Sequence, residues 1–227
     1  MLFRSIEAYK KFELKVNKLS TNDNVDISPG EFVLVYNEQQ IKWFEDMFRD
    51  RGTRYVDAVQ KLISHDQELI LDKDNSNHTD FKLPDNYFDY INSYSLADNG
   101  VCKDRVIYNE EIKIVNKNIL YKDEYNTPSF DYQEGFITLA GNMLQVYKNN
   151  FNITKTFLTY YRYPVNIDIE GYIKINGSAS ITVDPELSDH YVDEVIDYCV
   201  REVTKDYADV EGWQLANTTV KDNDTLN

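Results

Sequence analysis

Apolar side chains recur at helical spacing near the start of the chain. Residues 3–19 predict a first helix. Ser28, Pro29 and Glu31 predict the start of a second, because serine can cap the helix, proline suits its first position and Glu31 completes a capping box. The side chains expected to be buried are Ile6, Tyr9, Leu14 and Val16 in the first helix, and Phe32, Val35, Tyr36, Gln40, Trp43, Phe44 and Met47 in the second.

A third helical pattern lies near the end of the chain. Asp184 and Pro185 predict its start, as the N-cap and the first helical residue. Its apolar residues follow at steps of four, three and four, which predicts one buried stripe made of Val192, Ile196, Cys199 and Val203.

Between the helices the pattern becomes the alternation that is typical of strands. The expected strands are residues 60–71, 81–84, 87–96, 102–108 and 153–163, with a polar loop at 72–80 and a short helical turn at 119–125. In the third of these strands, alternation places Phe88, Tyr90, Asn92 and Tyr94 on one face.

Two glycine-containing pairs predict hairpins in the same region. Gly141-Asn142 separates the apolar runs 136–140 and 143–147, and Asn176-Gly177 separates 171–175 from 178–183. In the second hairpin one side is expected to carry Ile173, Ile175, Ala179, Ile181 and Val183.

The order of these elements predicts an α+β fold. We expect N-terminal helices, a central antiparallel part resembling a β-sandwich, and a C-terminal helix with a flexible tail. The corresponding regions are an N-terminal helical part (1–59), a β-rich part (60–183), a helix that packs with the helical part (184–207) and the tail (208–227).

Charge limits the classes of partner. The 227 residues include 24 basic and 39 acidic side chains, which gives a net charge of −15. Proteins that hold DNA through its phosphates carry a basic patch, so this composition argues against DNA binding. Residues 1–11 lack the apolar core of a signal peptide and no apolar run is long enough to span a membrane, so we expect a protein made in the cytoplasm, with no membrane partner.

The search for catalytic or metal-binding motifs is negative. Cys102 and Cys199 match no metal spacing, and no glycine-rich phosphate loop is present. The histidines, His65, His78 and His190, are isolated in sequence. We therefore expect no catalytic residue, no metal site and no cofactor.

The stretch TYYRYP, residues 159–164, concentrates aromatic side chains in one strand. Alternation places Tyr161 and Tyr163 on one face, and Tyr160 and Arg162 on the other. One face is expected to pack on the core while the other meets a neighbouring subunit, where Arg162 can pair with a carboxylate. Tyr160 and Arg162 are therefore candidate subunit-interface residues; in the alternative, both faces stay within one subunit.

Several motifs occur in a recognisable order. LPDNYFDYINSYS (83–95) is followed by YNTPSF (125–130), GNMLQVY (141–147), LTYYRYP (158–164) and DPELSD (184–189). Over residues 43–207 this order resembles the head–tail connector proteins of short-tailed bacteriophages, and is most similar to the neck ring proteins of crAss-like phages. Ser188 stands where proline is common in that family.

The resemblance implies a structural protein of the virion, in the neck or tail, without catalytic activity. It implies a helical part and a β-sandwich-like part built into a twelve-fold ring of identical chains between portal and tail. The expected partners are the portal protein, other neck or tail ring proteins and further copies of the chain. DNA passes through the lumen without specific binding, and the acidic charge suits such a channel because it keeps phosphates from sticking.

The tail carries Trp213 and Leu215 in polar surroundings. Because tryptophan is enriched at binding hot spots, both are candidate portal-docking residues. The alternative is that Trp213 folds back on its own domain. Two other functions stay open: a β-rich carbohydrate- or protein-binding module of a virion, and an enzyme whose site is assembled from dispersed residues.

Overall fold

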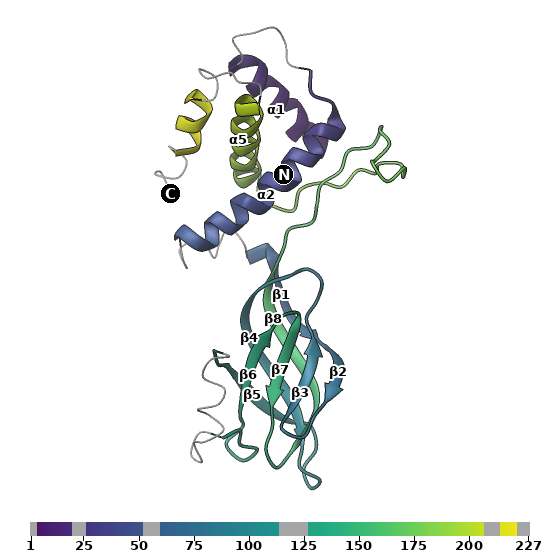
Figure 1. Ribbon diagram of the computed structural model, residues 1–227, viewed down its shortest axis with the longest axis vertical. Coiled ribbons are helices and arrows are strands. Elements are labelled where there is room, and N and C mark those ends of the chain that lie inside the picture. The colour runs from purple at the N-terminus through teal and green to yellow at the C-terminus, as the bar shows by residue number, and fades with distance from the viewer. Residues whose placement is uncertain (1–3, 20–25, 52–59, 114–126, 207–213, 222–227) are drawn as a thin grey trace. The chain divides into compact units, whose positions relative to one another are not determined.

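The computed structural model describes residues 4–19, 26–51, 60–113, 127–206 and 214–221 (Figure 1). The chain divides into two compact units. The first, here the helical unit, consists of Met1–Lys61 and Pro164–Asn227, and the second, here the sheet unit, is the continuous segment Leu62–Tyr163. The α+β class is confirmed, with helices at both ends of the chain and strands between them.

The helical unit contains the helices that the apolar spacing predicts. They are α1 (Ser5–Leu19), α2 (Pro29–Arg51) and α5 (Asp189–Asp206). Residues 214–221 form one further helix inside the region expected to be a flexible tail. The capping box is present, since the backbone N and the Oγ of Ser28 both donate to Glu31 Oε2, at 2.8 and 2.7 Å.

The helices of this unit share one core and are joined by polar contacts, some at its margin and one that is buried. Lys11 and Lys15 of α1 form ion pairs with Asp193 and Asp197 of α5. Between α2 and α5, the Trp43 indole donates to a carboxylate oxygen of Glu194 at 2.9 Å. The core contains Ala8, Phe12, Val16, Phe32, Tyr36, Trp43, Phe44, Met47, Val192, Val195, Ile196, Cys199, Val200 and Val203.

The predicted burial was right for α5 and partly wrong for α1. All four residues of the α5 stripe are buried, and the buried face also includes Val195 and Val200. In α1, however, Ile6 is exposed and Leu14 is 72% exposed, while Phe12 is fully buried. The helix turns Ala8, Phe12 and Val16 inward at steps of four, and Leu14 falls on the other side.

Helix α5 starts four residues later than predicted. Its first residue is Asp189, and the N–H of Val192 donates to Ser188 O. Asp184 caps a different helix: its Oδ1 accepts the backbone N of Ser5 at 2.8 Å, at the start of α1. The N-cap prediction for Asp184 was therefore wrong about which helix it serves, because a tertiary contact supplies the acceptor.

The sheet unit begins at the last residue of a short 3-10 helix, Gln60–Leu62, and contains one curled eight-stranded sheet (Figure 1). Its strands are β1 (Ile63–Glu68), β2 (Ile70–Asp74), β3 (His78–Lys82), β4 (Tyr87–Asp98), β5 (Arg105–Glu111), β6 (Glu134–Ala140), β7 (Met143–Tyr147) and β8 (Asn152–Arg162). They lie in the order β1-β8-β4-β5-β6-β7-β3-β2.

The two outer strands of this order are consecutive in the chain. β1 pairs with β8 at one end of the order, and β2 pairs with β3 at the other. Only Leu69 separates β1 from β2 in the chain. The sheet therefore curls back on itself. This differs from the expected antiparallel sandwich, because there is a single sheet and because β5 and β6 run parallel.

Two further strand predictions need correction. Residues 72–80 form parts of β2 and β3 and the turn between them, in which Thr79 Oγ1 donates to Asp74 Oδ1 at 2.6 Å. In β4, bulges between Tyr87 and Asp89 and between Tyr90 and Asn92 interrupt the alternation. Tyr90 therefore packs against the core, whereas Tyr94 stacks on Phe157 with ring centroids 5.0 Å apart. The predicted helical turn at 119–125 lies outside the described residues.

The core of the sheet unit is supplied entirely by its own strands and connections. It contains Leu69, Phe81, Leu83, Ala97, Ile107, Phe130, Ile137, Leu144, Val146, Phe151, Ile153, Leu158 and Tyr160. Both predicted hairpins are present, and Gly141 and Gly177 have the positive φ that such turns require. The second turn is longer than predicted: the N–H of Gly177 donates to the carbonyl of Lys174 at 2.9 Å, so the turn also includes Ile175. The second hairpin belongs to the helical unit, so the β-rich part ends near residue 163 and not at the expected 183.

Candidate binding groove

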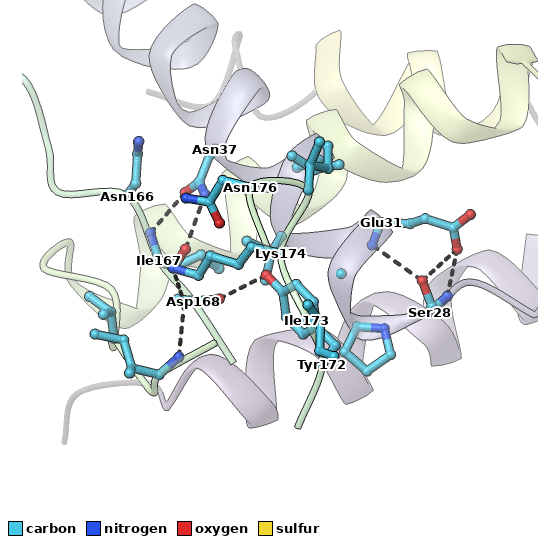
Figure 2. A pocket seen from close by; sticks show the side chains of 17 residues that line it. Ser28, Glu31, Asn37, Asn166, Ile167, Asp168, Tyr172, Ile173, Lys174 and Asn176 are labelled. Atoms are coloured by element: carbon cyan, nitrogen blue, oxygen red, sulfur yellow. Dashed lines mark hydrogen bonds and ion pairs between the residues drawn. The ribbon is translucent and has the colours of Figure 1, made fainter. Parts of the chain in front are cut away.

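A groove of about 770 Å³ lies in the helical unit, between the start of α2 and residues 166–183 (Figure 2). These residues, here the hairpin segment, contain the Asn176-Gly177 turn. The lining residues are Ser28, Pro29, Gly30, Glu31, Val33, Leu34, Asn37, Asn166, Ile167, Asp168, Tyr172, Ile173, Lys174, Ile175, Asn176, Ile181 and Val183.

Contacts with α2 hold the hairpin segment in place. The Asn37 side chain bonds both backbone groups of Ile167: its Nδ2 donates to the carbonyl oxygen at 3.0 Å, and its Oδ1 accepts the N–H at 2.8 Å. Gly30 allows the ring of Tyr172 to approach the helix start, since a Cβ there would lie 3.1 Å from the ring. The segment is thus fixed to the first turns of α2.

Asp168 organises the hairpin segment from within (Figure 2). Its Oδ1 accepts the Tyr172 hydroxyl at 2.8 Å and the N–H of Ile169 at 3.0 Å. Its Oδ2 accepts Lys174 Nζ at 2.7 Å and the N–H of Ile181 at 3.0 Å. One carboxylate therefore links both strands of the hairpin, and the residue is only 4% exposed.

The electrostatics of this cluster favour a structural role. Burial by itself raises the pKa of Asp168, but the hydrogen bonds from Lys174, Ile181, Tyr172 and Ile169 outweigh it and lower the pKa to about 2. Burial and the bond to Asp168 raise the pKa of Tyr172 to about 12. Near neutral pH neither group changes its protonation state, so the pair is poorly suited to general acid–base chemistry.

The rim of the groove is apolar and open to solvent. Ile173 is 77% exposed and Ile175 is 92% exposed, and Leu34 and Ile181 are exposed beside them. The pattern in the sequence predicts Ile173, Ile175 and Ile181 on one side of a hairpin, and all three line the groove, although Ile175 lies in the turn. It gave no signal that this side faces solvent, because a hairpin that packs on a core has the same alternation.

The two candidate interface residues on β8 have different surroundings. Tyr160 is 3% exposed, belongs to the core of the sheet unit and donates from its hydroxyl to Asn86 Oδ1 at 2.9 Å. Its side chain packs within its own subunit, as in the alternative reading of TYYRYP. Arg162 is partly exposed, and its Nη1 lies 3.5 Å from the carbonyl oxygen of Tyr163. The contact between Arg162 and a carboxylate of a neighbouring subunit stays a prediction.

Of the two candidate docking residues, only Leu215 lies in the described part of the chain, near the start of the helix 214–221. Trp213 is outside the described residues. Leu215 is 57% exposed, whereas Ala216 and Val220 of the same helix are buried. The helix thus packs through one side and presents Leu215 on another.

A second polar cluster surrounds the β2–β3 turn. Lys148 Nζ and Thr79 Oγ1 both donate to Asp74 Oδ1, at 2.6 Å each. Asn75 Nδ2 donates to Asp80 Oδ2 at 2.9 Å. These groups satisfy one another, and the described part of the chain contains no group of three or more histidine, cysteine or acidic residues that could hold a metal ion.

Comparison with known proteins does not assign this chain to a family. No protein-family model matches the chain, and no curated protein matches it. None of the helices that the structure describes has the length and apolar character needed to span a bilayer.

Proposed function

We propose that this chain is a structural protein of a tailed bacteriophage, forming a ring in the neck between portal and tail through which DNA passes. The observation that carries the proposal is the order of the motifs from LPDNYFDYINSYS to DPELSD, which is similar to that of neck ring proteins. The net charge of −15 supports a role around DNA without binding it, since an acidic lumen repels phosphates.

The decisive experiment is a cryo-electron microscopy reconstruction of the neck of the phage that encodes this chain. We expect density for both units in a ring with the symmetry of the stack, at the twelve-fold copy number that the family implies. Mass spectrometry of purified virions is the companion measurement. Absence of the chain from the virions contradicts the proposal.

Subunit contact through Arg162 is the first detail of this proposal to test. Arg162 lies at the end of β8, where it is partly exposed and can reach a carboxylate of the neighbouring copy. Arg162→Ala should weaken neck assembly by about 1–3 kcal/mol per contact if the carboxylate partner stays buried. Lys155→Ala, on the same strand, is the matched control because Lys155 forms a surface pair with Glu68 that contributes little. Equal assembly of both variants argues against the contact.

Portal docking through the end of the chain is the second detail. Leu215 is exposed on a helix that packs through Ala216 and Val220, so it is available to a partner. In a pull-down with purified portal, we expect loss of binding after truncation at residue 207. Trp213→Ala should account for most of that loss, about 2 kcal/mol or more. Thr218→Ala, an exposed position on the same helix, should bind normally. Full binding by the truncated chain contradicts docking.

A carbohydrate-binding module of a virion is the second candidate function. Tyr108 and Tyr132 are both largely exposed, and the N–H of Tyr108 donates to the carbonyl of Gln133, so the two tyrosines lie in neighbouring segments. Exposed aromatic faces can stack on sugars. Glycan-array binding that is lost in Tyr108→Ala and Tyr132→Ala favours this function over the ring.

A further inference from the structure

We infer that the hairpin segment is a docking edge for one extended strand of a partner protein, a strand in which aliphatic and basic side chains occur together. The partner strand adds to the open edge at Ile173 and lays its aliphatic side chains in the groove beside α2. This inference concerns a surface that the ring proposal does not use.

The backbone of the hairpin leaves one edge open. The N–H of Ser180 donates to the carbonyl of Tyr172 at 3.0 Å, and the N–H of Lys174 donates to the carbonyl of Ser178 at 2.9 Å. Ile173 lies between them and opposes Ala179 as a bridge partner. Because successive residues of a strand direct their backbone groups to opposite edges, the N–H and C=O of Ile173 point away from the hairpin.

Nothing in the described part of the chain covers this edge. Among the described residues, no hydrogen bond reaches the backbone N–H or C=O of Ile173 or Ile175. Both side chains are exposed, and they line the groove together with Leu34 and Ile181. Unpaired backbone groups next to aliphatic side chains form a template for strand addition.

Hydrogen bonds within the helical unit fix the conformation of this edge before any partner binds. Asp168 bonds Tyr172 and Lys174 in one strand of the hairpin and Ile181 in the other, and Asn37 fixes the neighbouring Ile167 to α2. Such an edge loses little conformational entropy on binding, which raises the affinity available from a few contacts.

The charge of the groove favours a partner strand that carries basic side chains. Three charged residues line the groove: Glu31, Asp168 and Lys174. The last two form an ion pair at 2.7 Å and cancel, so Glu31 leaves the groove with a charge of −1. Lysine or arginine beside the aliphatic residues of the partner complements Glu31 and the net charge of −15 on the whole chain. The same charge opposes a second copy of this chain as the occupant.

The test uses the full chain and labelled ten-residue peptides with capped ends. One peptide alternates valine with lysine and its match alternates valine with glutamate. Fluorescence anisotropy at physiological ionic strength should show the valine–lysine peptide binding at least about tenfold more tightly. Ile175→Ser should weaken that binding at least about tenfold, because it removes the aliphatic contact without adding charge, whereas Val101→Ser, at an equally exposed position of the sheet unit, should not change it.

A second pair of variants separates strand addition from simple apolar contact. Ile173→Pro keeps an apolar side chain but removes the outward N–H, so it should weaken binding at least about tenfold. Ile173→Val keeps both features and should bind within about twofold. Thermal melting of each variant shows that it is folded.

Three results overturn the inference. The first is the absence of valine–lysine binding up to about 1 mM, which corresponds to about −4 kcal/mol. The second is equal binding of the two peptides, or equal binding by Ile173→Pro and Ile173→Val. The third is self-association in analytical ultracentrifugation that Ile175→Ser abolishes, because the occupant is then a second copy. Imaging of the virion neck bears on the ring proposal alone.

Discussion

At the scale of single residues, Asp168 determines the shape of the hairpin segment. Its carboxylate accepts hydrogen bonds from four donors, and two of these are backbone N–H groups that lie twelve residues apart in the chain, those of Ile169 and Ile181. A carboxylate can satisfy all four because it has acceptor sites on both oxygens and no donor of its own.

Asp168→Asn should therefore destabilise the helical unit by about 2–3 kcal/mol, because an amide places a donor against groups that themselves donate. Glu170→Gln is the matched control, since Glu170 is exposed two residues away and should change the free energy of unfolding by less than about 0.5 kcal/mol. Urea unfolding of both variants at neutral pH measures the difference. Equal stability means that the four bonds contribute nothing net.

The same carboxylate predicts a dependence of stability on pH. The pKa of Asp168 is lowered to about 2 in the folded chain, against about 3.9 for an unfolded aspartate. Its contribution is fully present above about pH 4 and is lost as the pH falls towards about 2. The melting-temperature difference between wild type and Asp168→Asn should thus be constant from pH 5 to 7 and narrow steadily below about pH 4. A difference that stays constant down to pH 2 contradicts the assignment.

At the scale of elements, two apolar residues of α1 differ in how far they are buried. Phe12 is fully buried, whereas Leu14 is largely exposed. Phe12→Ala should lower the free energy of unfolding by about 3–5 kcal/mol through lost burial and a cavity, and Leu14→Ala should change it by less than about 0.5 kcal/mol. Chemical unfolding monitored by circular dichroism compares the two. A large loss in Leu14→Ala is expected only if another surface covers that residue.

The start of α1 gives a second element-scale prediction. Asp184 accepts both the backbone N and the Oγ of Ser5, at 2.8 and 3.2 Å. Asp184→Ala should cost about 1 kcal/mol, as the loss of a helix cap does. Asp184→Asn keeps an acceptor and should recover at least half of that loss. The melting temperatures of the two variants decide whether the contact acts as a cap.

Helices and turns were predictable because their signals are local. The capping box at Ser28, the α5 stripe and the turns at Gly141 and Gly177 all depend on residues within a few positions of one another. The curled sheet was not predictable, since the pairing of β1 with β8 joins segments about 90 residues apart. The groove was missed for a related reason. It forms where the start of α2 meets the hairpin segment, and Asn37 and Ile167, which join the two, lie 130 residues apart in the chain.

At the scale of the whole molecule, the sheet unit is inserted between two parts of the helical unit. It comprises Leu62–Tyr163, and its core is built from its own residues. Its first and last strands are neighbours, with Ile63 opposite Tyr161. Its two ends therefore lie close together without help from the rest of the chain.

The excised segment 62–163 should fold alone and melt in one cooperative transition, with near-ultraviolet circular dichroism typical of packed aromatic rings. The segment 1–61 should stay largely unfolded, because α1 and α2 bury their apolar faces partly on α5. Parallel thermal scans of the two segments are the measurement. A non-cooperative melt of 62–163 contradicts the division into two units.

The insertion also sets the order in which the protein can fold on the ribosome. α2 ends at Arg51 and α5 ends at Asp206, so about 155 residues must be added before α5 is complete. At about 5–20 residues per second this takes roughly 8–30 s. During that interval the apolar residues of α1 and α2 have no α5 to pack against, while the strands of the sheet unit are synthesised and can fold. The nascent chain thus presents a chaperone with two unpacked apolar segments that cannot fold until α5 is made, although the sheet unit made afterwards can fold before them.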